Sequence, residues 1–90
     1  MKVTVRYTAQ LREAAGAASE VVDLANPPTV AELVKFLADR HGDGFRAVAF
    51  GASGRPAVLI VVGETQVRSD DPRKLADGVI VSLLAPISGG

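Results

Sequence analysis

The sequence of 90 residues contains no cysteine and few aromatic side chains, with three phenylalanines, one tyrosine and no tryptophan. Without cysteine, the chain cannot form disulfides, a zinc ribbon, a thioredoxin-like motif or a thiol nucleophile. Hydrophobic residues nevertheless make up 48% of the chain, whereas aromatic residues make up only 4%. We therefore expect a folded globular domain whose core is filled mainly by aliphatic side chains.

The sequence also lacks a charge bias, because ten basic residues face ten acidic residues. A net charge of zero argues against nucleic acid or an acidic membrane as the main partner. No apolar run approaches the roughly 20 residues that span a bilayer. Residues 1–6 alternate in polarity, unlike a signal peptide. We expect a single cytoplasmic domain, too small to hold separate catalytic and cofactor domains.

Hydrophobic periodicity predicts strands over residues 2–8, 19–24, 57–62, 65–67 and 79–84, and a helical turn over 11–16. The clearest helix begins after Thr29, whose hydroxyl forms a capping box with Glu32, and ends at Gly42. Residues 43–56 form a weakly specified connection with a short helical turn over 45–50. A further turn is expected at residues 70–72, where Pro72 suits the first position of a helix.

These elements indicate an α+β fold, with a mixed sheet of about five strands and one main helix packed on one face. The first and last strands are both apolar and can lie side by side in the middle of the sheet. That arrangement is the β-grasp, or ubiquitin-like, architecture, although periodicity alone supports only the α+β class. Residues 1–84 are predicted to form the domain, and residues 85–90 a flexible tail.

The polar residues contain no clear catalytic or metal-binding constellation. His41 is the only base available to several serines, and we expect it to have a structural role at a helix C-terminus. Asp39, His41 and Asp43 are more consistent with a solvated face than with a metal site. Asp70 and Asp71 are explained by turn formation, since the spacing of a calcium loop is missing. No metal ion or stably bound cofactor is predicted.

The C-terminal residues are more informative. Pro86 cannot donate a ladder hydrogen bond, so the last strand should end before it. The tail then consists of Ile87, Ser88, Gly89 and Gly90. Glycine lacks Cβ, so this tail can enter a narrow channel, and an ionised terminal carboxylate can attack the α-phosphate of ATP. An unhindered glycine carbonyl in the resulting acyl-adenylate is then open to sulfur or another nucleophile.

The strand pattern also predicts a partner surface near this tail. If Val58, Ile60, Val62, Val81 and Leu83 face the helix, the intervening residues point away from it. An uncovered apolar patch then results, and such patches usually mark interfaces; it comprises Leu59, Val61, Ile80 and Leu84. The alternative is that the connecting loop covers the patch.

Three blocks of the sequence, residues 5–16, 29–33 and 75–90, make the chain resemble the MoaD/ThiS family of ubiquitin-like sulfur carriers. The closest resemblance is to MoaD, the small subunit of molybdopterin synthase. The blocks contain the Leu-Arg-Glu segment after the first strand, the capped helix start, and the Asp-Gly turn followed by a Pro-x-x-Gly-Gly ending. Departures are Thr8 in place of a frequent phenylalanine, Val79 in place of an acidic residue, and Ala85 in place of a proline.

The resemblance implies a β-grasp fold and a reaction cycle centred on Gly90. A MoeB/ThiF-like enzyme would adenylate Gly90 with ATP and magnesium. A sulfur donor, a cysteine desulfurase or a rhodanese-like protein, would convert it to a thiocarboxylate. The tail would then enter the active site of a MoaE-like large subunit, and its sulfur would pass to cyclic pyranopterin monophosphate in molybdenum cofactor biosynthesis.

Other functions remain open at this point. The chain could carry sulfur for thiamine, cysteine or tRNA thiolation, or act as a protein modifier joined to lysines through Gly90. A non-covalent ubiquitin-like binding module would not need the tail. A stand-alone enzyme is the least favoured alternative, because the sequence offers no catalytic constellation.

Overall fold

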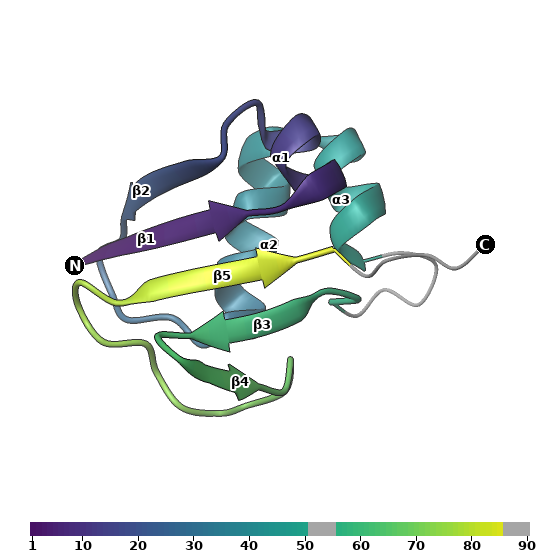
Figure 1. Ribbon diagram of the computed structural model, residues 1–90. Coiled ribbons are helices and arrows are strands. Elements are labelled where there is room, and N and C mark those ends of the chain that lie inside the picture. Colours follow the sequence, from purple (N-terminus) through teal and green to yellow (C-terminus); the bar gives the residue numbers. More distant parts are fainter. Residues whose placement is uncertain (51–55, 86–90) are drawn as a thin grey trace.

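The alternation of apolar and polar residues over the first strand places Val3, Val5 and Tyr7 in the core of the structure. The structure is a computed structural model that describes residues 1–50 and 56–85. Within these residues the elements follow one another along the chain as shown in Figure 1: β1 (Lys2–Tyr7), α1 (Ala9–Ala15), β2 (Ser19–Asp23), α2 (Val30–His41), α3 (Asp43–Phe50), β3 (Leu59–Val62), β4 (Thr65–Val67) and β5 (Ile80–Leu84).

The five strands form one mixed sheet in the order β2-β1-β5-β3-β4. The first and last strands are parallel neighbours in its middle, with Val5 opposite Val81. The pairs β1–β2, β3–β5 and β3–β4 are antiparallel. This topology confirms the predicted strand order and the β-grasp architecture.

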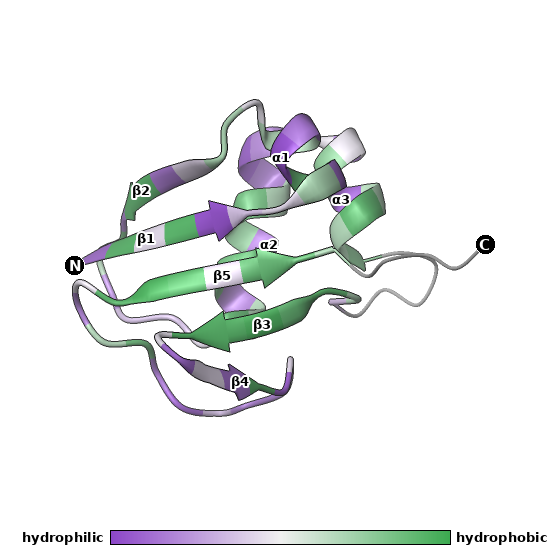
Figure 2. Cartoon of the chain, viewed as in Figure 1, coloured by the Kyte–Doolittle hydropathy of each residue, from purple (hydrophilic) through white to green (hydrophobic). Residues whose placement is uncertain are grey.

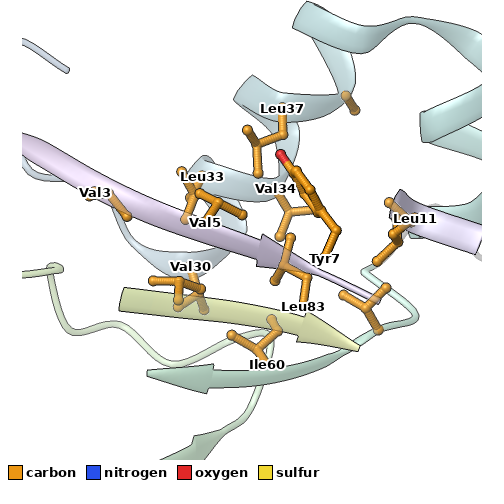
Figure 3. Packing of buried hydrophobic residues seen from close by; sticks show 14 of the residues in the cluster. Val3, Val5, Tyr7, Leu11, Val30, Leu33, Val34, Leu37, Ile60 and Leu83 are labelled. Carbon is orange, nitrogen blue, oxygen red and sulfur yellow. The ribbon is translucent and has the colours of Figure 1, made fainter. Parts of the chain in front are cut away.

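The helices lie on one side of the sheet (Figure 1), and the core fills the space between the two layers. Helix α2 contributes Leu33, Val34 and Leu37, each fully buried. Their spacing gives the helix one apolar stripe that faces the sheet. Figure 3 shows these side chains meeting those of the central strands, among them Val5, Tyr7, Ile60 and Leu83. As expected, the core is almost entirely aliphatic.

Capping residues confirm the predicted start and end of α2 and the predicted end of α1 at Gly16, whereas α1 begins at Ala9, two residues before the predicted helical turn. The Thr29 hydroxyl accepts a hydrogen bond from the Glu32 amide at 3.2 Å, and the Glu32 carboxylate accepts one from the Thr29 amide at 2.8 Å. Helix α1 ends at Gly16, which has a φ of 77°. That left-handed conformation is accessible to glycine without the clash that a Cβ would cause.

The helical content exceeds the prediction of one main helix, since the described residues contain three. Residues 43–50 form a regular helix, α3, of eight residues, where only a short helical turn is predicted. The helix is stabilised by packing, because Phe45 and Ala49 are fully buried. The Phe45 ring meets the Tyr7 ring edge to face, with centroids 5.6 Å apart. Residues 51–55 of the predicted connection lie outside the described residues.

The turn predicted at residues 70–72 lies slightly earlier, where the Asp71 amide donates to the Arg68 carbonyl at 3.1 Å, and residues 71–76 form no helix after it. The Asp71 carboxylate instead accepts a hydrogen bond from the Arg73 amide at 2.9 Å. The Leu75 amide donates to the carbonyl of Pro28 at 2.8 Å, which fixes this segment against the start of α2. Side-chain and long-range partners thus replace the helical hydrogen bonds, and the predicted turn at Asp77 and Gly78 is present.

Candidate functional site

The strand that precedes the Gly-Gly ending lies in the centre of the sheet. β5 is bonded to β1 on one side and to β3 on the other, and it ends at Leu84. Ala85, the last described residue, packs partly against the core. The predicted tail residues lie outside the described residues: Pro86, Ile87, Ser88, Gly89 and Gly90. The last described residues before the tail, Leu84 and Ala85, are called the base of the tail.

The predicted apolar patch lies on the face of the sheet opposite the helices. Leu59 and Ile80 remain 49% and 43% exposed, whereas Val61 and Leu84 are half-buried. Leu59 of β3 is paired directly with Leu84 of β5, so the patch adjoins the base of the tail. Figure 2 colours both strands almost entirely as hydrophobic. The strand faces are confirmed, and the role of these four residues in binding a partner stays a prediction.

Thr8 lies directly after β1, at the same end of the sheet as the end of β5. It is exposed, and its side chain makes no capping hydrogen bond to α1. Tyr7, the preceding residue, is paired with Leu83, so Thr8 follows β1 at the end of the sheet where β5 reaches Leu84. An exposed threonine therefore lies beside the end of β5.

A polar network that the sequence analysis did not identify joins the strands to the helices. Glu20 of β2 accepts a hydrogen bond from the Tyr7 hydroxyl at 2.6 Å and contacts His41 Nε2 at 2.5 Å. Its other carboxylate oxygen lies 3.3 Å from Nε of Arg40. His41 also lies against Phe45, with ring centroids 5.1 Å apart. One carboxylate therefore joins β1, β2 and α2.

Burial, hydrogen bonds and neighbouring charges together shift the pKa values of Tyr7 and Glu20 in this network. Burial of the Tyr7 hydroxyl, its hydrogen bond to Glu20 and the charge of that carboxylate raise its pKa well above the ordinary value. Burial alone would also raise the pKa of Glu20, but the hydrogen bonds from Tyr7 and His41 and the charges of His41 and Arg40 lower it overall. Tyr7 thus remains a donor, and Glu20 remains an ionised acceptor.

The predicted structural role of His41 is confirmed, and Asp39 and Asp43 are exposed as expected, but His41 itself does not belong to a solvated face. The His41 side chain is only 15% exposed and is committed to Glu20, while Asp39 pairs with Arg46 at 2.6 Å. One sequence signal could have revealed the network. Glu20 lies two residues before buried Val22, so strand alternation turns its side chain toward the helices, where a carboxylate requires partners.

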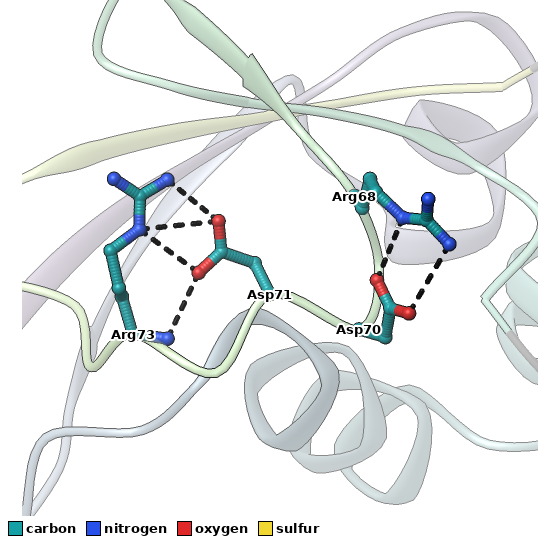
Figure 4. A network of polar contacts seen from close by, with 4 residues as sticks. All are labelled: Arg68, Asp70, Asp71 and Arg73. Carbon is teal, nitrogen blue, oxygen red and sulfur yellow. Dashed lines mark hydrogen bonds and ion pairs between the residues drawn. The ribbon is translucent and has the colours of Figure 1, made fainter.

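Two further carboxylates are committed to arginines, as Figure 4 shows. Asp70 pairs with Arg68 at 3.0 Å, and Asp71 pairs with Arg73 at 2.7 Å. The hydrogen bonds from the Arg73 side chain and amide lower the pKa of Asp71 to about 2. Within residues 1–50 and 56–85, no group of three or more histidine or acidic side chains is placed to hold a metal ion.

The fold and the central position of β5 define the chain as a β-grasp domain that carries its Gly-Gly ending after a central strand. The model of the ThiS family matches residues 5–90. The chain belongs to the ThiS family. No curated protein matches it. Among the helices of the described residues, none is long and apolar enough to cross a membrane.

Several solved structures are similar over the whole chain. A Pyrococcus furiosus protein provisionally described as molybdopterin converting factor subunit 1 is 30% identical, with a TM-score of 0.76 over 97% of this chain and 99% of that one. SAMP1 from Haloferax volcanii is 23% identical, with a TM-score of 0.82 and full coverage of both chains. A complex of subunits 1 and 2 of molybdopterin-converting factor from Helicobacter pylori contains a chain 23% identical, with a TM-score of 0.62 and full coverage of both.

Proposed function

We propose that this chain is a sulfur carrier that is activated at Gly90, and that it serves as the small subunit of a molybdopterin synthase. The observation that carries the proposal is the continuity between the central strand β5 and the Gly-Gly ending, within a ThiS family match that extends to residue 90. The likeness to the Pyrococcus furiosus subunit 1 supports the molybdopterin role.

The chemistry requires a partner at each step, because the domain supplies the terminal carboxylate alone. An adenylating enzyme of the MoeB/ThiF kind binds ATP and magnesium, and the Gly90 carboxylate attacks the α-phosphorus and releases pyrophosphate. The terminal sulfur of a persulfide on a cysteine desulfurase or rhodanese-like donor then attacks the acyl carbonyl and displaces AMP, which gives an acyl disulfide. A thiol supplies the two electrons that cleave this S–S bond, and the cleavage releases the donor's thiolate and leaves a thiocarboxylate on Gly90. In a MoaE-like large subunit, this sulfur passes to cyclic pyranopterin monophosphate.

The exposed sheet face supplies a surface for these partners. Leu59 and Leu84 lie beside each other where β5 ends, so a partner that covers them is close to the start of the tail. Burial of apolar surface then provides the binding energy, and the glycines provide narrow access to the partner's active site. In this proposal the open face of the sheet binds the partner, and the adjoining Gly-Gly tail carries the reacting carboxylate.

Intact-mass spectrometry tests the proposal directly. After incubation with a MoeB/ThiF-like enzyme, ATP, magnesium and a sulfur source, the mass should increase by the exchange of one oxygen for one sulfur atom. Deletion of Gly89 and Gly90 should abolish the change, whereas Ser88→Ala, in the same tail, should retain it. The absence of the exchange, under conditions that thiocarboxylate a known carrier, would contradict the proposal.

Three further measurements separate the alternative functions. A protein modifier would be adenylated at the same glycine but would be recovered from its host in isopeptide linkage to lysines. A carrier for thiamine, cysteine or tRNA thiolation would form the thiocarboxylate yet fail to deliver sulfur to cyclic pyranopterin monophosphate with a MoaE-like subunit. A non-covalent binding module would keep its function without Gly89 and Gly90.

A further inference from the structure

The charges on the strands that form and flank the apolar patch are mainly positive, and the acidic residues Glu64 and Asp77 lie in the turns near its Ile80 end. Four strands, β1, β3, β4 and β5, contain no acidic residue, and β1 contains two basic residues, Lys2 and Arg6. The acidic strand residues lie on β2: Glu20, which is committed to its network, and Asp23, which is paired in register with Lys2. The central part of the sheet is therefore apolar with a positive charge.

Arg6 is the cation placed closest to the patch in the strand register. It is exposed between buried Val5 and Tyr7, so strand alternation turns it to the open face of the sheet. Its paired neighbours are Ser19 on β2 and Ser82 on β5, and Ser82 is paired in turn with Val61 of the patch. One uncharged residue thus separates Arg6 from Val61.

The Arg6 guanidinium also differs from most arginines of the domain. Arg40, Arg46, Arg68 and Arg73 each pair with a carboxylate of this chain. Across residues 1–50 and 56–85, Arg6 has no ion-pair or hydrogen-bond partner for its side chain, and no carboxylate lies in its cross-strand positions. Its charge therefore remains available to a carboxylate from another molecule.

We infer that Arg6 and the apolar patch form one docking surface, and that its occupant is the adenylating enzyme of the proposed function, whose face places a carboxylate opposite Arg6 within an apolar surround. This inference rests on the proposed function, because the occupant it describes is a protein that receives the tail. The apolar contacts contribute most of the affinity, and the Arg6 charge speeds encounter and fixes the orientation of the domain. A correctly oriented domain directs its tail to the partner's active site.

The test uses the full chain and the MoeB/ThiF-like adenylating enzyme encoded in the same genome as the probe. Binding kinetics are compared for the wild type, Arg6→Ala, Arg6→Glu and the matched control Lys35→Glu. Lys35 is exposed on α2, on the helical side of the sheet, and its side chain likewise has no ion-pair partner within the described residues. Circular dichroism verifies that each variant is folded.

Arg6→Glu should lower the affinity about tenfold, mainly through a slower association rate, with a smaller loss for Arg6→Ala. Lys35→Glu should change it by about twofold or less. The difference between Arg6→Glu and the wild type should shrink between about 0.01 M and about 1 M salt, because the screening length falls from about 30 Å to about 3 Å. Equal affinities for Arg6→Glu and Lys35→Glu would overturn the inference.

Pyrophosphate release, measured in parallel, separates this inference from the function on which it rests. If the wild type is adenylated and Arg6→Glu binds as well as the wild type, the docking surface is wrong and the carrier function stands. If the enzyme activates a known carrier but neither binds nor adenylates this chain, the carrier function and the docking surface both fail.

Discussion

The two faces of the sheet use the same residue types for different purposes. On the helical face, Val81 and Leu83 are fully buried. On the open face, their neighbours Ile80 and Leu84 keep part of their surface in contact with solvent. Because these residues alternate along one strand, the hydrophobicity of β5 as a whole says little about its role. The difference teaches that stability should depend on one set of positions and partner binding on the other.

The largest loss of stability is expected from Leu83→Ala, on the buried face. Removal of a fully buried leucine side chain loses its transfer free energy and leaves a cavity, at a cost of about 2–5 kcal/mol. Urea denaturation measures the change in the free energy of unfolding. A loss below about 1 kcal/mol would mean that this position contributes no more than an ordinary surface residue, and the distinction between the faces would fail.

A smaller loss is expected from Glu20→Ala, at the border of the buried face. The substitution leaves the Tyr7 hydroxyl and His41 without their acceptor and should cost about 1–3 kcal/mol. Tyr7→Phe, which removes one donor of the same network, is the matched control and should cost less. Urea denaturation measures both losses in the free energy of unfolding. A Glu20→Ala variant as stable as the wild type would show that the carboxylate does not stabilise the fold.

The contribution of the Glu20 carboxylate to the free energy of unfolding should depend on pH in a defined direction. The folded state lowers the pKa of Glu20 below its unfolded value of about 4.3. The contribution is therefore fully present above about pH 4.3 and is lost as the pH falls through the lower folded-state pKa. Urea denaturation of the wild type and Glu20→Gln across this range should show their difference shrinking toward acid pH. A difference that grows toward acid pH would contradict the assigned role.

The cap of α2 provides a prediction of smaller size. Thr29→Ala removes the hydroxyl that accepts a hydrogen bond from the Glu32 amide, and the free energy of unfolding should fall by about 0.5–2 kcal/mol. Thr8→Ala is its matched control, because Thr8 occupies the same position before α1 but makes no capping hydrogen bond. Thermal unfolding should show a lower Tm for Thr29→Ala and little change for Thr8→Ala. Equal shifts would show that the capping contact is not the cause.

The smallest effect on stability is expected on the open face, from Leu59→Asp. This side chain is 49% exposed, so a charge there remains solvated, and the change in the free energy of unfolding should be within about 0.5 kcal/mol. Binding to the adenylating enzyme, measured by calorimetry, should nevertheless weaken. Leu84→Asp should behave similarly in the binding measurement. Loss of folding in both variants would show that the open face contributes to the core.

The buried and open faces of the sheet and the start of α2 could be predicted from the sequence, because strand alternation and helix capping are local signals. Strand alternation places Val5 and Leu83 on the buried face, and the capping box places Thr29 at the start of α2. The local sequence predicts only a short helical turn where α3 lies, because the stability of this helix comes from the packing of Phe45 and Ala49 against the rest of the core. The Glu20 network was missed for a related reason, because it joins residues 13 and 21 positions apart.

The parallel pairing of β1 with β5 has a mechanical consequence for a domain that is held by its end. Hydrogen bonds in both ladders lie across the strands, so a pull on the chain beyond Ala85, directed along β5, loads them in shear. Thr4–Tyr7 and Leu59–Val62 share that load from opposite sides. Several bonds must break together before β5 can slip. A domain paired in this way should resist unfolding when it is pulled by that end, which the proposed carrier cycle would require each time the tail leaves a partner.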